Sequence, residues 1–457
     1  MPLPAPAATV LGAIAIPVLL VFAAASPAAA ADPAPAATEA PVGTSPIAVA
    51  FSPDGATAYV ANEGDATVSV VDVVTAATTT TITVGAVPFA VVVAPDGSRV
   101  YVADYGSAAV SVIDAATNTV VDTIPVASSP GGLALSPDGG VLYVSSFTGS
   151  TVSSIDTGTD ALLATSPVGS GPFAVVASAT AVATTNLNGN SVTCLSPDLA
   201  TTIGTATVTG FPQSLAISTD GRTAAVPSLG TGKVTTIDLS DCSVSASYTV
   251  GTSPLGVAFT TDDSRLLVAN ASDSTVSVID LATGVVTTTD VADNPGGIAI
   301  SADGSTLAVT SQTADLLALY ALPTVSAPAD ASVTDGQTAT FQVTTTGTPD
   351  TVTWQRSDDD GASWADIAGA TGESYAISAT SADDGTRFRA IATTAAWGSA
   401  ASAAATLTVT APAVVTPSGP QLADTGADVL TPLLFGLLLL LVGVMIGIAV
   451  RRRIRQN

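Results

Sequence analysis

The stretch YVANEGDATVSVVD, Tyr59–Asp72, returns 42 residues later as YVADYGSAAVSVID, Tyr101–Asp114. A third version, LVANASDSTVSVID, ends at Asp280. Each repeat unit opens at a proline, and these openings are Pro46, Pro88, Pro130, Pro172, Pro212, Pro254 and Pro295. The openings are 42, 42, 42, 40, 42 and 41 residues apart, and a period near 40 predicts either a solenoid or a propeller.

The content of each unit decides between these two architectures. A unit reads as an apolar strand, an Asp-Gly turn, a short strand, a loop, an alternating strand, a turn and a Thr-rich strand. FSPDG, 51–55, and SPDG, 136–139, are examples of the first turn, where glycine accepts positive φ between two strands. Four strands without helical periodicity indicate propeller blades. We therefore predict an all-β chain with a seven-bladed β-propeller over residues 32–323.

The last unit ends at Leu322 and is one strand short. The segment TEAPVGTSP, 38–46, resembles the ends of the other units. We therefore expect the N-terminal segment to supply the missing outer strand of the seventh blade, which would cover two exposed sheet edges.

The motif Tyr59-Val60-Ala61-Asn62 and its surroundings resemble the YVTN repeat family of seven-bladed propellers. The resemblance covers the propeller region and implies a surface or periplasmic protein.

The composition changes at residue 324, and residues 324–411 alternate like an immunoglobulin-like β-sandwich. This module resembles bacterial Ig-like domains. The resemblance places Val343 and Ala390 at the two cysteine positions, Trp354 in the core, and Phe388 at the tyrosine-corner position. Residues 412–421 read as a short Pro/Thr/Ser linker.

The two ends of the chain predict an exported protein. Residues 1–31 read as a signal peptide with an Ala-rich cleavage site. Residues 429–450 form an apolar run long enough for a transmembrane helix. The tail, 451–457, carries four arginines that favour the cytoplasmic side.

A short motif precedes the apolar run: Leu422, Ala423, Asp424, Thr425 and Gly426. Motif, span and basic tail together resemble the LAxTG-type cell-wall sorting signal of actinobacterial sortase substrates. The resemblance implies that a sortase attacks the Thr425 carbonyl and transfers the chain to peptidoglycan. The alternative is a single-pass membrane anchor that is never cleaved. Both place the protein on the extracellular face of a Gram-positive bacterium.

Charge and composition exclude several classes of function. The 37 acidic and 11 basic residues give a formal charge of −26, which repels phosphate backbones, so we expect no nucleic-acid partner. The chain has no histidine, which excludes Ser-His-Asp and Cys-His catalysis and His-ligated metals. We expect no cofactor, no metal and no catalytic residues. A propeller enzyme of lactonase or quinoprotein type, and a structural surface-coat protein, remain alternatives.

Several recurring polar residues invite a functional interpretation. Aspartates recur in the first hairpins (Asp54, Asp96, Asp138, Asp220, Asp303) and at strand ends (Asp72, Asp114, Asp156, Asp238, Asp280). Their recurrence favours hydrogen bonds within turns over catalysis. Seven loop residues occupy equivalent positions: Asn62, Asp104, Ser146, Asn186, Ser228, Asn270 and Ser311. These seven either form a ligand-binding ring or brace their own loops.

Two further groups of residues each allow two interpretations. Ser357-x-Asp359-x-Gly361-x-Ser363-Trp364 fits the Asp-box pattern, a folded hairpin, and its neighbouring aspartates 358–360 are either a calcium site or a solvated turn. Cys194 and Cys242 lie in neighbouring blades and form either a disulfide, as export favours, or two buried thiols.

The loops after the second strand of each blade vary most, and such loops carry recognition. They contain the candidate ligand-binding residues Tyr105, Phe147, Asn188 and Lys233, the only lysine in the chain. We therefore predict a non-enzymatic binding or adhesion protein for an unidentified extracellular protein or glycan. The propeller is its head and the Ig-like module its spacer.

Overall fold

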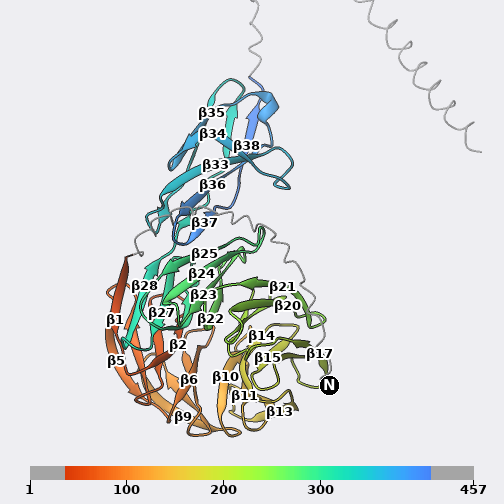
Figure 1. The fold of residues 1–457 in the computed structure, drawn as a ribbon. Coiled ribbons are helices and arrows are strands. Elements are labelled where there is room, and N and C mark those ends of the chain that lie inside the picture. Colours follow the sequence, from red (N-terminus) through yellow and green to blue (C-terminus); the bar gives the residue numbers. More distant parts are fainter. Residues whose placement is uncertain (1–35, 413–457) are drawn as a thin grey trace, which may run out of the picture. The chain divides into compact units, whose positions relative to one another are not determined.

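The computed structural model describes residues 36–412, which form β-strands and one short 3₁₀ helix (Figure 1). The predicted signal peptide, the sorting motif, the apolar run 429–450, the basic tail and nearly all of the linker lie outside these residues. Within residues 36–412, no helix is both long and apolar enough to cross a membrane.

Seven four-stranded antiparallel sheets make up the first module. Their inner strands are β2 (Pro46–Phe51), β6 (Pro88–Val93), β10 (Pro130–Leu135), β14 (Pro172–Ala177), β18 (Ala216–Ile217), β22 (Pro254–Phe259) and β26 (Pro295–Ile300). The second strands are β3 (Thr57–Asn62), β7 (Arg99–Asp104), β11 (Val141–Ser146), β15 (Val182–Asn186), β19 (Thr223–Ser228), β23 (Arg265–Asn270) and β27 (Thr306–Ser311).

The third strands are β4 (Thr67–Asp72), β8 (Ala109–Asp114), β12 (Thr151–Asp156), β16 (Ser191–Leu195), β20 (Lys233–Asp238), β24 (Thr275–Asp280) and β28 (Leu316–Ala321). The outer strands are β5 (Ala77–Thr83), β9 (Thr119–Pro125), β13 (Leu162–Pro167), β17 (Thr202–Thr207), β21 (Ser243–Thr249), β25 (Val286–Asp290) and β1 (Ala37–Pro41). Blades 1 to 7 are numbered in the order of their inner strands.

The sheets are arranged as a closed ring, as a propeller requires. Each inner strand contacts the next, and β26 contacts β2. Figure 1 shows β27 and β28 of blade 7 beside β1 and β2. The strand β1 pairs antiparallel with β28, from Ala37 opposite Tyr320 to Pro41 opposite Leu316. The first strand of the described chain therefore completes the last blade, and this part of the prediction is confirmed.

Blade-on-blade packing explains why the second strands are apolar on both faces. In β3, residues 58–61 are at most 3% exposed, because one face packs on the preceding blade and the other on the following blade. The inner strands come closer still. A Cβ added at Gly132 would lie 2.5 Å from the Phe173 carbonyl oxygen, and one at Gly297 would lie 2.6 Å from that of Ile47. Only glycine fits where neighbouring backbones approach this closely.

Cys194 and Cys242 form a disulfide between blades 4 and 5, with their Cα atoms 5.8 Å apart. A mid-strand residue can meet a turn residue here because Gly204 lies opposite Cys194 on the outer strand β17. A Cβ at Gly204 would come within 2.8 Å of the Cys242 Cβ. Because glycine has no side chain, Gly204 leaves room for the disulfide. The structure therefore has a disulfide here and not two buried thiols.

The second module consists of short strands in three sheets. Its strands are β29 (Thr324–Val325), β30 (Ala331–Thr334), β31 (Thr338–Gln342), β32 (Thr345–Thr346), β33 (Thr351–Ser357), β34 (Ala365–Thr371), β35 (Ser374–Ser378), β36 (Arg387–Thr394), β37 (Gly398–Ala401) and β38 (Ala405–Thr410), with the 3₁₀ helix η1 (Ser381–Asp383). Six of these strands form the largest sheet, while β31 pairs with β35 and β29 with β32.

The core of this module is aromatic. Trp354, Phe341 and Phe388 are at most 1% exposed, and the rings of Phe341 and Phe388 stack with centroids 4.8 Å apart. The Trp354 indole N–H donates to the Gly372 carbonyl oxygen at 2.9 Å. Val343 and Ala390 are buried in the same core. An apolar cluster therefore stabilises the module around Trp354.

Candidate functional site

Two sets of loops meet on one face of the ring. The loop after each second strand hydrogen-bonds to the segment that leads into the inner strand of the same blade. Thus the Tyr105 N–H donates to the Val87 carbonyl at 3.0 Å, and the Phe147 N–H donates to the Ser129 carbonyl at 3.0 Å. We call this side the mouth face. The Asp-Gly turns lie at the other ends of the same strands, and we call that side the hairpin face.

The recurring aspartates of the hairpin face hold their own turns. Asp54 accepts hydrogen bonds from the Ser52 hydroxyl and the Ala56 N–H, and these bonds hold the pKa of Asp54 below its usual value. Asp72 accepts from the Thr75 hydroxyl and N–H in the same way, which lowers its pKa. The turn interpretation of these residues is confirmed.

The seven equivalent loop residues are all at most 2% exposed, so they brace loops. The Asn62 amide donates to the Thr67 and Ser69 hydroxyls at 3.0 and 2.9 Å. Asn186 and Asn270 make the same pair of bonds in blades 4 and 6. A ligand cannot reach side chains buried beneath the loops, and the alternative of a ligand-binding ring is wrong.

Asp104 departs from this pattern. It stands where blades 1, 4 and 6 have asparagine, and Ala109 replaces the first hydroxyl partner. The Ser111 hydroxyl donates to Asp104 Oδ2 at 2.6 Å, while Oδ1 is buried without a partner. Burial raises the pKa of Asp104 to about 6, although the hydrogen bonds from Ser111 and Gly85 oppose the shift. The mouth face therefore contains a carboxyl group that is poorly solvated when charged.

Four half-buried aromatic side chains gather above blades 2 to 4, and we call them the aromatic patch: Phe89, Tyr105, Phe147 and Phe173. The ring of Phe89 lies 5.7 Å from Tyr105 and meets Phe173 edge-on at 5.0 Å. Phe147 completes the set, 6.2 Å from Tyr105 and 6.1 Å from Phe173. The inner strand between Phe89 and Phe173 has Gly131 and Gly132, so the two rings can meet across blade 3.

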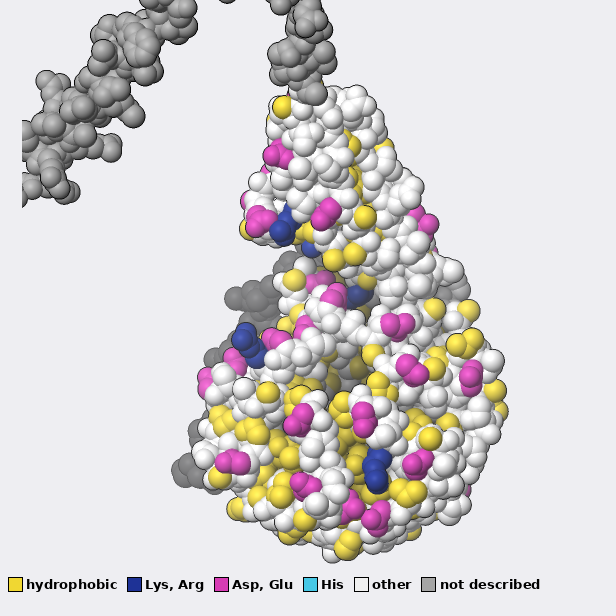
Figure 2. All heavy atoms as spheres, turned by 180° about the vertical axis from the view of Figure 1, so that it is seen from behind, with side chains coloured by type: hydrophobic (Ala, Val, Ile, Leu, Met, Phe, Trp, Pro, Cys, Tyr) yellow, Lys and Arg dark blue, Asp and Glu magenta, His cyan; other side chains and the backbone are white. Residues whose placement is uncertain are grey.

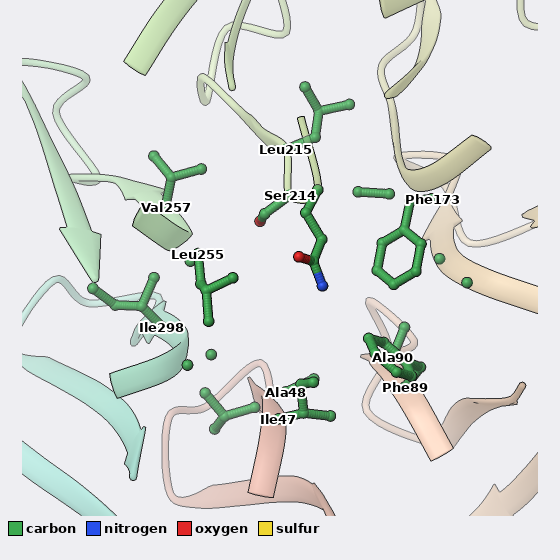
Figure 3. A pocket seen from close by; sticks show the side chains of 18 of the residues that line it. Ile47, Ala48, Phe89, Ala90, Phe173, Ser214, Leu215, Leu255, Val257 and Ile298 are labelled. Carbon is green, nitrogen blue, oxygen red and sulfur yellow. The ribbon is translucent and has the colours of Figure 1, made fainter. Parts of the chain in front are cut away.

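A cavity of about 230 Å³ continues from this patch into the ring. Six inner strands, the segment 213–215 before β18 and Gln312 line it. Its large apolar side chains include Ile47, Leu133, Leu215, Leu255, Ile298, Phe89 and Phe173, most of which are labelled in Figure 3. Phe89 and Phe173 lie on one side of the cavity and Leu255 and Ile298 on the other (Figure 3). Its polar side chains are those of Gln213, Ser214 and Gln312, and none of the lining residues is ionisable.

Known proteins share this architecture. A family model described as a YNCE-like beta-propeller matches residues 14–335. The chain belongs to the YNCE-like beta-propeller family. The YVTN repeat resemblance fits this assignment. A second family model, a domain of unknown function (DUF8696), matches residues 324–411.

Two individual proteins are similar to parts of this YNCE-like propeller chain. Hydrazine synthase of Kuenenia stuttgartiensis superimposes with a TM-score of 0.55 at 20% sequence identity, covering 61% of this chain and 96% of that chain. The likeness shows a shared fold. Endoglucanase C of Cellulomonas fimi is 45% identical over 109 residues, which are 24% of this chain and 9% of that protein. The match thus spans less than a tenth of the endoglucanase.

The YNCE-like propeller brings three of the four predicted loop residues together. Tyr105 and Phe147 belong to the aromatic patch, and a Cβ added at Gly171 would touch both Phe147 and Asn188. Lys233 is exposed at the start of β20 and is not among the residues that line the cavity. None of the four predicted residues lines the cavity, but Tyr105 and Phe147 belong to the aromatic patch beside it, whereas Lys233 belongs to neither.

Sequence reasoning missed Phe89, Phe173, Gln213 and Gln312. A signal for the two phenylalanines was present, because they follow the opening proline in blades 2 and 4, where blades 3 and 7 have glycine. Gln213 follows the opening proline of blade 5 in the same way, and Gln312 holds the loop position that Tyr105 and Phe147 hold in blades 2 and 3. Only the closed ring brings the two glutamines to one cavity.

The charge on the mouth face of the YNCE-like propeller is unevenly distributed. Its accessible carboxylates sit in the loops of blades 6, 7 and 1: Asp273, Asp293, Asp315, Glu63 and Asp65. The corresponding loops of blades 2 to 5 contain only the buried Asp104 as an acidic residue. The mouth therefore has an aromatic half and an acidic half. Over the face shown in Figure 2, acidic side chains clearly outnumber basic ones.

Aspartates 358–360 of the second module each have a different partner. Asp358 pairs with Arg356 at 2.7 Å, and Asp360 pairs with Arg387 at 2.8 Å. Asp359 accepts hydrogen bonds from Ser357 and Ser363, which lower its pKa to about 2. The three carboxylates diverge, so the arrangement supports the turn interpretation and gives calcium no shared site.

The substitution Asp104→Asn should stabilise the protein above pH 6. The folded-state pKa lies above the unfolded value, so the native state loses stability as the pH rises from about 4 to about 6. Asparagine removes this penalty, which we estimate at roughly 2–3 kcal/mol at pH 7.5. Thermal unfolding should show a higher Tm for the variant at pH 7.5 and a small difference near pH 4.

The control is the same change at the exposed Asp293, which should leave Tm nearly unchanged at both pH values. A lower Tm for Asp104→Asn at pH 7.5 would show that the Asp104 carboxylate stabilises the blade.

Proposed function

We propose that the chain is a cell-surface, wall-anchored, non-enzymatic binding protein that recognises an extracellular protein or glycan with the mouth of its propeller. The observation that carries this proposal is the continuity between the aromatic patch and the uncharged cavity. Concave apolar sites with a few polar groups are the usual form of a ligand pocket. Aromatic rings add contact area at a small cost in conformational entropy.

The lining of the cavity favours binding over turnover. A lactonase or quinoprotein reaction needs a general base, a metal or a charged cofactor held close to the substrate. The residues that line this cavity have no carboxylate, thiol, amine or guanidinium group. The similarity to Endoglucanase C covers 9% of that protein and supports no catalytic role here.

The remaining segments suit display on the cell surface. We infer that the second module is an immunoglobulin-like sandwich that acts as a spacer, since its core surrounds Trp354 as such domains require. The disulfide between blades 4 and 5 suits an oxidising compartment. The motif 422–426, followed by an apolar run and four arginines, supports export and attachment to peptidoglycan by a sortase.

The double variant Tyr105→Ala/Phe147→Ala should lose specific binding. Removing two half-buried rings should cost roughly 2–3 kcal/mol of binding free energy, which is at least a tenfold loss of affinity. The measurement is an array of extracellular glycans and secreted proteins, probed with the full-length chain in uncharged-lipid nanodiscs. Lys233→Ala, outside both the aromatic patch and the cavity, is the matched control and should keep the wild-type profile. Hits that survive the double variant, or an array without a specific hit, would contradict the proposal.

The attachment of the chain predicts a defined C-terminus. Sortase processing should leave Thr425 joined to a peptidoglycan fragment in protein released from the wall by a muralytic enzyme. Mass spectrometry of the C-terminal peptide measures this directly. Surface protein that mostly retains residues 451–457 would show that the chain stays a membrane protein.

A further inference from the structure

We infer that the cavity at the mouth takes one bulky apolar side chain from a basic polypeptide segment. This inference rests on the proposed function and names its ligand class. Three independent features of the mouth support it: the size and polarity of the cavity, the hydrogen-bonding groups beside it, and the acidic half of the mouth face.

The cavity has the size of a single large side chain. A cavity of about 150 Å³ is enough to hold benzene in a protein core, and this one measures about 230 Å³. Its largest side chains are aliphatic or aromatic, among them Ile47, Leu255, Ile298, Phe89 and Phe173, while exposed main chain and three polar side chains make much of the remaining wall polar. Burying one indole or a large aliphatic group in it contributes about 1.5–3 kcal/mol.

A sugar ring fits these walls less well. Each ring brings several hydroxyl groups, and a buried hydroxyl without a partner costs about 1–3 kcal/mol. Three lining side chains, those of Gln213, Ser214 and Gln312, are polar. Together with the open main chain of residues 213–215, they can satisfy a few groups of a ligand, which suits a side chain and its adjoining peptide units better than a ring that carries hydroxyls on every side.

The wall of blade 5 offers groups that can bind a peptide backbone. Here the ladder to β19 covers only Ala216 and Ile217, with an isolated bridge from Pro212 to Ser228. Gln213, Ser214 and Leu215 lie between these two points, outside the ladder and on the cavity wall. Their main-chain groups, together with the two glutamine amides, can pair with the peptide units that flank an inserted side chain.

The acidic loops of the mouth face, which we call the rim of the cavity, favour a positively charged ligand. Asp273, Asp293 and Asp315 lie in the loops of blades 6 and 7. Each uses a carboxylate oxygen to hold a loop, as when Asp315 Oδ1 accepts the Ser45 N–H at 2.9 Å, and each lies in a loop of the mouth face. Lys233 is the only basic residue in the mouth-face loops and stands outside the cavity. Lysines or arginines beside the inserted side chain would therefore find complementary charge.

The test uses fluorescein-labelled pentapeptides and the full-length chain in uncharged-lipid nanodiscs, with fluorescence anisotropy as the measurement. The peptides are KKWKK, KKAKK and EEWEE, and a neutral glucose tetramer competes in a separate series. We expect KKWKK to bind at least tenfold more tightly than KKAKK, because the indole is buried, and at least tenfold more tightly than EEWEE, because the rim is acidic. The glucose tetramer should not displace it.

Two sets of variants locate the binding. Ile47→Trp and, separately, Leu255→Trp place an indole inside the cavity and should each weaken KKWKK binding at least tenfold. Using two filling variants, each with an unchanged circular dichroism spectrum, guards against a misfolded protein. Asp273→Asn/Asp293→Asn/Asp315→Asn keeps the loop acceptors and should weaken binding about tenfold at low salt. The matched control Asp54→Asn/Asp96→Asn/Asp138→Asn changes the charge equally on the hairpin face and should stay within twofold of wild type.

Each other outcome overturns a specific part of the inference. Equal affinity for KKWKK and KKAKK would contradict the insertion of a bulky side chain into the cavity. KKWKK binding that is unchanged in both Ile47→Trp and Leu255→Trp would contradict it too. Equal affinity for KKWKK and EEWEE would contradict the preference for a basic partner. If the glucose tetramer binds and is lost in Ile47→Trp, the mouth binds a glycan, so this inference fails while the proposed function stands. If no probe binds the wild-type chain, the inference fails, and the array decides the proposed function separately.

Discussion

The pairing of β1 with β28 is the interaction on which the whole head depends. It joins the first described strand to the third strand of the last blade and covers the edge that β28 would otherwise expose. With the ring closed, every inner strand has a neighbour on both sides, and β26 contacts β2. The cavity exists only under this condition, because its walls come from all seven blades.

Closure also divides the propeller into two different faces. The hairpin face has the same arrangement in several blades: an aspartate carboxylate accepts hydrogen bonds from the N–H groups of its own turn. These carboxylates therefore already have partners within the turn. The mouth face uses buried asparagines, or their replacements, to hold its loops from below. Because the support lies beneath the surface, the exposed loop residues can vary between blades without loss of the fold. The aromatic and acidic halves of the mouth are built from these variable residues.

The fold was largely predictable because its determinants are local and repeated. The period, the Asp-Gly turns and the opening prolines predicted the blades, and the short last unit predicted that an N-terminal strand would complete it.

The site was only partly predictable. Tyr105 and Phe147 are recognisable in the sequence because they interrupt a repeated loop, whereas Phe89 and Phe173 lie inside strands, where an aromatic residue suggests core packing. Charge alone marks Lys233 as a candidate, but Lys233 begins the third strand of blade 5 and lies outside both the aromatic patch and the cavity. Sequence alone does not decide the disulfide, because Gly204, which makes room for it, lies on a third strand.

The central claim is that one face of the closed ring recognises a ligand while the other is scaffold. Hydrogen exchange of the full-length chain, with and without the tightest specific hit of the extracellular array, tests it most directly. The account predicts slower exchange at residues 85–89, 105–107, 147–149 and 211–215, and unchanged exchange at the hairpin turns 52–55, 94–97 and 136–139. Protection confined to the hairpin turns would contradict it.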